Sequence, residues 1–167
     1  MSDLVEVAVE DPRWDGIGVE ALAEQAARAA LAELGLPADG YHIALMAGDD
    51  ARIAALNADF RGRPQPTNVL SWPSEERGAA APGGIPPPPR PGSADDPAEL
   101  GDIALAWETC AGEAAAADKP LADHIRHLVV HAVLHLCGYD HIADADADVM
   151  EAIEVRALAR MGLSDPY

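Results

Sequence analysis

The stretch HAVLHLCGYDH, residues 131–141, places three histidines within eleven positions and sets a glycine before the last of them. Where the stretch begins as a helix, His131 and His135 project from one face about 6 Å apart, because four residues turn through about 400°. His141 would lie on the far side if that helix continued, so the helix must end before it. Gly138 is placed to end it, since glycine accepts the left-handed geometry of a helix C′ position. The pattern therefore predicts that the chain folds back and brings His141 to the other two imidazoles.

Three imidazoles that meet at one point can hold a divalent metal ion and leave a fourth position open for water, as catalytic zinc requires. We predict a single Zn²⁺ ion bound by His131, His135 and His141, although other divalent metals accept the same ligands. His127 could pair with His131 at the same spacing, but no nearby chain reversal supplies that pair with a third ligand. We therefore expect His127, together with Asp140, to support the ligands rather than to bind the ion.

The segments around this stretch predict an α/β fold with a small mixed sheet of about four strands, packed with about five helices. Residues 121–136 are apolar nearly all round, which is typical of a buried central helix that carries the histidines. Strand patterns at 5–9 and 41–47 flank a helical pattern at 19–34, which predicts two parallel strands joined by a helix. The other expected helices run from Asp49 or Asp50 to Phe60, over 108–118, and from a cap at Asp144 to before Gly162; the other expected strands are 68–72 and 100–107.

The composition limits the kinds of protein that this sequence can encode. The chain of 167 residues is most simply one domain, 1–167, in which 78–99 form a Pro- and Gly-rich surface loop, flexible or polyproline-like. Two cysteines are too few for a disulfide framework, and the acidic N-terminal stretch resembles neither a signal peptide nor a membrane span, so we expect a cytoplasmic protein. The formal net charge of −18 argues against a general nucleic-acid binder, but salt screening allows a local basic cleft.

The residues around the histidines favour some metal chemistries over others. A bound cation lowers the pKa of its water to about 7 and so supplies a nucleophile at neutral pH. Helical metallopeptidases place a glutamate after the first histidine as general base, but Ala132 stands here, which makes proteolysis a weaker hypothesis. Three neutral ligands leave the ion its full charge, which suits a phosphodiester. Arg61 and Arg63 could hold such a phosphate, although the residues alone are equally consistent with ordinary surface arginines.

Two sequence blocks resemble those of one family. The stretch KPLADHIRHLVVHAVLHLCGYDH resembles the pattern H-G-x-L-H-L-x-G-Y-D-H of the YbeY family, bacterial metal-dependent endoribonucleases, with Ala132 in place of the glycine. The stretch LNADFRGRPQPTNVLSWP resembles the family's L-N-x-x-(Y/F)-R followed by T-(D/N)-V-L-S-F-P, with Trp72 in place of the phenylalanine. LGDIAL and MGLSDPY also match, so the resemblance covers nearly the whole chain. The insert at 78–99 is longer than the family usually has.

The resemblance implies an α/β fold, a zinc ion on His131, His135 and His141, and an arginine at Arg61 that lines the cleft and contributes to RNA cleavage. We thus expect Arg61 and the metal ligand His131 to serve catalysis. It also implies a role in maturation of small-subunit ribosomal RNA and in ribosome quality control. The expected partners are ribosomal RNA and the small ribosomal subunit with its assembly proteins, without membrane or DNA. Two alternatives remain open: a different metal hydrolase such as a peptidase, and a non-catalytic ribosome assembly factor stabilised by zinc.

Overall fold

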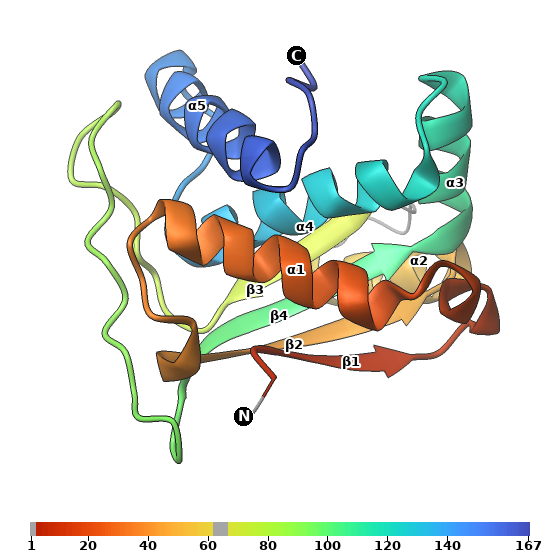
Figure 1. Ribbon diagram of the computed structural model, residues 1–167, viewed down its shortest axis with the longest axis horizontal. Coiled ribbons are helices and arrows are strands. Elements are labelled where there is room, and N and C mark those ends of the chain that lie inside the picture. The colour runs from red at the N-terminus through yellow and green to blue at the C-terminus, as the bar shows by residue number, and fades with distance from the viewer. Residues whose placement is uncertain (1–2, 62–66) are drawn as a thin grey trace.

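The computed structural model describes residues 3–61 and 67–167, without the side chains of Phe60 and Arg61. Its centre is a four-stranded sheet in the order β1-β2-β4-β3 (Figure 1). The strands are β1 (Val5–Val9), β2 (Tyr41–Gly48), β3 (Val69–Pro73) and β4 (Ala98–Ala106). β1, β2 and β4 run parallel, and β3 pairs antiparallel with β4. The predicted α/β fold with a small mixed sheet is confirmed.

Helices cover the two faces of the sheet unequally (Figure 1). The helices are α1 (Val19–Glu33), α2 (Asp50–Arg61), α3 (Trp107–Ala116), α4 (Leu121–Leu136) and α5 (Asp144–Arg160), with short 3-10 turns at Pro12–Ile17 and Ala38–Gly40. α1 and α4 pack side by side on one face, and α5 lies across both as an outer layer. α2 covers part of the opposite face, where its Ile53 joins a small cluster with Leu70 and Ala104. α4 is therefore enclosed by the sheet, α1, α3 and α5, as its all-round apolar sequence predicts.

The alternation of side chains along the strands decides which residues face α4. In β3, Leu70 packs into the cluster under α2, so its neighbours Val69 and Ser71 point to the opposite face. In β4, Ile103 and Leu105 join the main core below α1 and α4. A polar side chain, Ser71, is thereby placed on the face of the sheet that carries the histidine helix.

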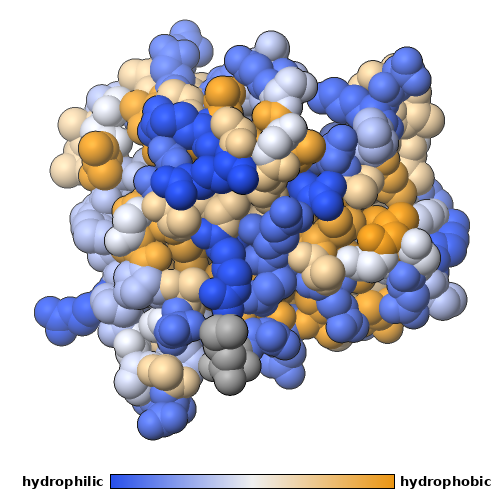
Figure 2. Space-filling model, in the orientation of Figure 1, coloured by the Kyte–Doolittle hydropathy of each residue, from blue (hydrophilic) through white to orange (hydrophobic). Residues whose placement is uncertain are grey.

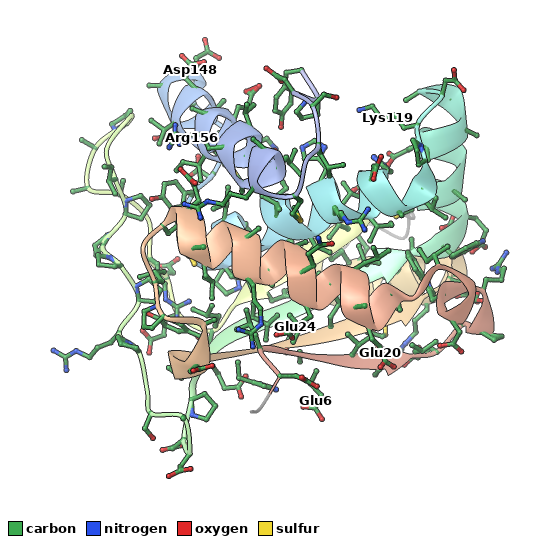
Figure 3. All side chains as sticks on the ribbon, in the orientation of Figure 1. Glu6, Glu20, Glu24, Lys119, Asp148 and Arg156 are labelled. Atoms are coloured by element: carbon green, nitrogen blue, oxygen red, sulfur yellow. The ribbon has the colours of Figure 1, made fainter. Side chains whose placement is uncertain are left out.

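Side chains of the helices also fasten the ends of the strands. Glu24 of α1 reaches down to the start of β1 (Figure 3), where its carboxylate accepts the N–H groups of Leu4 at 3.1 Å and Val5 at 2.9 Å. β1 is an edge strand, so these donors have no strand neighbour on that side. At the other end of α1, Glu33 accepts hydrogen bonds from Arg156 and Arg160 of α5, each at 2.7 Å.

The Pro-rich segment 78–97 lies along the molecule as an extended strap. Pro86 and Pro89 are buried while Pro87 and Pro88 are exposed, which is the three-residue repeat of a polyproline helix. Hydrogen bonds fasten the strap to the domain: the Tyr41 hydroxyl donates to the Pro89 carbonyl, and the Gly92 N–H donates to the Gly40 carbonyl at 2.8 Å. The strand predicted at 100–107 begins two residues earlier, at Ala98, and Trp107 already belongs to α3.

The last helix begins differently from the prediction. Asp144 is its first residue rather than its cap, because Ala143 occupies the N-cap position and makes no side-chain cap bond. Asp146, in the first turn, instead accepts the Gly83 N–H of the strap at 2.7 Å. In the described part of the chain, no helix combines the length and the apolar character needed to cross a membrane. Figure 2 shows hydrophilic residues over most of the visible face, with apolar groups between them.

Candidate metal centre

The turn that follows α4 has the geometry that the sequence predicts. Gly138 has φ +102°, its N–H donates to the His135 carbonyl at 3.0 Å, and the Tyr139 N–H donates to the Leu134 carbonyl at 3.1 Å. These two bonds form a Schellman motif, which satisfies carbonyls at the helix end and reverses the chain. The turn is also tight: a Cβ on Gly138 would lie 2.2 Å from the Arg77 carbonyl oxygen. Only glycine meets both demands, so this residue carries the chain back toward α4.

The three predicted ligands line one cavity of about 560 Å³. His131 and His135 enter it from α4 and are half-buried, while His141 enters from the returning chain and is exposed. The remaining wall comes from the start of β3, from α4, from the loop after it and from Tyr167. The other lining residues are Thr67, Asn68, Val69, Ser71, His127, Leu128, Asp140, Ile142 and Tyr167.

The imidazole rings fit a zinc ion in donor type and in part of their spacing. The ring centroids of His131 and His141 lie 5.0 Å apart with an interplanar angle of 62°. Two imidazoles on one tetrahedral zinc ion have centroids about 5 Å apart. Across residues 3–61 and 67–167, however, no three His, Cys, Asp or Glu side chains are close enough together to hold a metal ion. As their side chains lie here, the three histidines therefore share one cavity without lying close enough together to form a metal site.

A buried carboxylate that the sequence reasoning missed orients His131. Glu154 of α5 is 1 % exposed and lies 3.1 Å from Nδ1 of His131, 2.7 Å from Nε2 of His127 and 2.5 Å from the Tyr167 hydroxyl. Burial opposes its charge, but the hydrogen bonds from His127, His131 and Tyr167 outweigh burial and lower the pKa of Glu154 to about 2. An ionised carboxylate only accepts hydrogen bonds, so Nδ1 of His131 carries the proton. In the neutral ring, Nε2 then keeps its lone pair for an ion.

A hydroxyl from the sheet holds the second predicted ligand. Oγ of Ser71 in β3 lies 2.5 Å from Nδ1 of His135. This contact exists because the strand alternation points Ser71 toward α4, and it fixes the orientation of the imidazole. The sequence reasoning identified the strand around Ser71 but assigned this side chain no role.

The predicted supporting residues His127 and Asp140 lie at the cavity, whereas two further side chains of a kind that can bind metals, His124 and Cys137, do not line it. His127 supports Glu154 and lines the cavity, and Asp140 lines it too, with its carboxylate accepting the Ile142 N–H at 3.3 Å. His124 bonds to Glu113 of α3 at 2.9 Å. Burial raises the pKa of the Cys137 thiol to about 12, so it is protonated at neutral pH and packs in the core.

The predicted catalytic arginine can be placed only by its backbone. Arg61 is the last residue of α2, and its side chain, like the whole of Arg63, lies outside the described residues. Thr67, where the described chain resumes, lines the histidine cavity.

A sequence signal for Glu154 was present. Met150, Ile153 and Ala157 of α5 are buried, and Glu154 stands among them on the same face of the helix. A charged residue at such a position requires partners, because an unpaired buried carboxylate is strongly destabilising. The spacing does not say which residues these partners are, since they come from α4 and from the end of the chain.

Comparison with known proteins identifies a matching family model, closely similar sequences and a solved structure with a similar fold. A family model described as Endoribonuclease YbeY matches residues 8–162. Curated relatives named Endoribonuclease YbeY include one from Cereibacter sphaeroides, 56 % identical over the full length of both chains, and one from Dinoroseobacter shibae, 55 % identical over 98 % of this chain and 90 % of its own. The solution structure of TM1509 from Thermotoga maritima has a TM-score of 0.55 at 19 % identity, over 97 % of both chains, and shares the fold.

Proposed function

Because this chain belongs to the endoribonuclease YbeY family, we propose that it is a zinc-dependent endoribonuclease that cleaves single-stranded RNA at the histidine cavity. His131, His135 and His141 hold the ion in this proposal. The observation that carries it is the cavity itself, which collects all three histidines from two segments, with a buried carboxylate behind one ring and a hydroxyl behind another. Partners of this kind on the outer nitrogen are typical of histidines that bind metals.

The residues of the chain have separate tasks in this proposal. When bound, the ion supplies a Lewis acid to the phosphodiester and acidifies a water molecule. Glu154 and Ser71 keep the imidazoles of His131 and His135 in place. Arg61 stabilises the negative charge that develops on the phosphoryl oxygens, which a guanidinium does through paired hydrogen bonds. We infer from the family resemblance that small-subunit ribosomal RNA is the substrate and that assembly proteins of that subunit are partners.

The peptidase alternative receives little support from the site. Ala132, at the position where a helical metallopeptidase has its glutamate, is 1 % exposed and packs in the core. Glu154 is buried under three hydrogen bonds, so it is placed to orient histidines rather than to exchange protons with a substrate. The site therefore favours a reaction in which the ion and the arginine act on an anionic substrate.

The test is cleavage of a single-stranded RNA oligonucleotide by the purified protein, with and without a chelator. We expect chelation to abolish cleavage and added zinc to restore it. Arg61→Ala should lower the rate about 10²- to 10³-fold, as the loss of one donor to a developing oxyanion does. Arg90→Ala is the matched control, because Arg90 is an exposed arginine of the strap.

Three outcomes would contradict the proposal. Cleavage that survives both chelation and Arg61→Ala would indicate a contaminating nuclease and favour the assembly factor. Cleavage of an unfolded protein substrate with RNA left intact would favour the peptidase. Equal cleavage of a DNA oligonucleotide of the same sequence would remove the restriction to RNA.

A further inference from the structure

Large apolar side chains are exposed at the rim of the histidine cavity. Within the described residues, three large hydrophobic side chains are strongly exposed: Ile142 at 91 %, Ile85 at 77 % and Tyr167 at 61 %. Ile142 and Tyr167 both line the cavity, whereas Ile85 lies on the strap. Single exposed apolar residues are ordinary, but two at one functional cavity indicate a surface that something covers.

The ring of Tyr167 is exposed but firmly held. Its hydroxyl bonds to the buried carboxylate of Glu154 at 2.5 Å, and its ring meets the His127 ring edge to face, with centroids 5.6 Å apart at 87°. Burial and the bond to Glu154 raise the pKa of the Tyr167 hydroxyl, so it stays protonated and donates to the carboxylate. A ring that is already fixed loses little conformational entropy when a second flat group stacks on it.

We propose that Tyr167 and Ile142 form a nucleobase clamp, in which an unpaired base of the RNA stacks on the Tyr167 ring and contacts the Ile142 side chain beside the histidines. The inference rests on the proposed function, since it names the part of the RNA that this site would grip. Every nucleobase has a flat face that stacks on an aromatic ring, whatever its sequence. Thr67 lines the same cavity and adds a polar group to its wall, while the amide of Asn68 is bound to Glu113 at 3.0 Å.

The clamp also predicts a preference for single strands. A base inside a duplex is stacked and paired, so it cannot enter a cavity unless it leaves the helix. The chain has 11 Lys and Arg against 29 Asp and Glu, which leaves few cations for contacts to phosphates, so contacts to bases should carry a larger share of the affinity. The clamp supplies such a contact without adding positive charge.

The test measures binding of a short, labelled, single-stranded RNA to the full chain by fluorescence anisotropy, in chelator so that no cleavage occurs. Tyr167→Leu removes the ring and should weaken binding about 5- to 100-fold. Tyr167→Phe keeps the ring and loses only the bond to Glu154, so it should stay within about threefold of the parent. Ile142→Ala should weaken binding severalfold, and Ile85→Ala, the matched control outside the cavity, should not change it.

A second set of ligands locates the base. Replacing successive nucleotides of the RNA by abasic ones should weaken binding to the parent most at one position. An abasic nucleotide at that position should not weaken RNA binding to Tyr167→Leu any further, because the ring on which the base stacks is already absent from this variant. Blunt duplex RNA should bind the parent and Tyr167→Leu equally.

The proposal is overturned if Tyr167→Leu and Ile142→Ala bind RNA as the parent does, or if Tyr167→Phe loses as much affinity as Tyr167→Leu. It is also overturned if Tyr167→Leu loses affinity only for an apolar peptide, which would make the rim of the cavity a contact for a protein.

Far-UV circular dichroism identifies a misfolded variant. If Tyr167→Leu misfolds, Ile142→Ala still tests the proposal, because Ile142 is 91 % exposed and its replacement should not disturb the fold. Failure of the clamp leaves chelator-sensitive cleavage intact, whereas failure of the proposed function removes it from the parent.

Discussion

Glu154 brings three polar side chains to a single buried point. It lies on α5, yet its hydrogen-bond partners come from α4 and from the end of the chain. Burying a carboxylate is costly unless donors surround it, so these contacts are tightly linked to one another. One residue thereby sets the tautomer of His131 and fixes the ring of Tyr167, which are respectively a proposed metal ligand and a proposed base contact.

Replacing Glu154 by glutamine tests this role. Glu154→Gln keeps the size of the side chain but removes its charge and cannot accept from three donors, so His131 is held less firmly. We expect the dissociation constant for zinc to rise about 10- to 100-fold, measured by competition with a chromophoric chelator. The control is Glu151→Gln, one turn earlier on the same helix. Equal zinc affinity in the parent and both variants would show that Glu154 is not a positioning residue.

At the scale of an element, the end of α4 decides whether His141 can reach the site. Gly138→Ala places a Cβ in a positive-φ residue and against the Arg77 carbonyl, so the turn must distort. We expect a loss of about 3 kcal/mol in the free energy of unfolding, measured in urea, together with weaker zinc binding. Gly112→Ala is the control: Gly112 lies in α3 with open space around it, and alanine should stabilise that helix by about 0.5–1 kcal/mol. Similar unfolding for both variants would contradict the role given to the turn.

The packing of α5 on α1 depends in part on one carboxylate. Hydrogen bonds from Arg160 and Arg156 (the latter labelled in Figure 3) hold the pKa of Glu33 below its ordinary value. A lowered folded-state pKa means that the stabilisation is present above the unfolded-state pKa and is lost as the pH falls through the folded-state pKa. Glu33→Gln should therefore cost about 1 kcal/mol at pH 7, and the difference from the parent should shrink below about pH 4.

Urea denaturation at pH 7 and at pH 3 measures this difference. Glu75→Gln, at an exposed glutamate outside the helices, should match the parent at both pH values. A cost for Glu33→Gln that is the same at both pH values would show that its charge is not responsible.

At the scale of the whole molecule, zinc binding should be coupled to stability. An ion that binds only the folded chain adds about 2.7 kcal/mol when its free concentration is 100 times the dissociation constant. For a domain of this size that corresponds to a rise of about 5–10 °C in Tm. Thermal unfolding followed by circular dichroism, with zinc and then with excess chelator, measures the shift. An unchanged Tm would contradict the expectation that zinc binds the folded chain and not the unfolded one.

Much of this architecture could be predicted from the sequence because its signals are local. Apolar periodicity gave the helices and strands, and the spacing of His131, His135 and Gly138 predicted the helix and its reversal. Contacts between distant segments carry no such signal: neither Glu154 beneath His131 nor Ser71 beside His135 follows from spacing along the chain. The contacts of the Pro-rich strap could not be predicted either. Its composition indicates a surface segment, but it does not indicate the hydrogen bonds that fasten the strap to Gly40 and Asp146.

The most direct test of the account is the zinc content of the purified protein after saturation and gel filtration, by elemental analysis. Three histidines holding one ion predict about one zinc per chain in the parent, and much less in His135→Ala. His124→Ala is the matched control on the same helix, because His124 bonds to Glu113 and does not line the cavity. It should retain zinc as the parent does. A parent that retains no zinc, or His135→Ala that retains as much as the parent, would contradict the account.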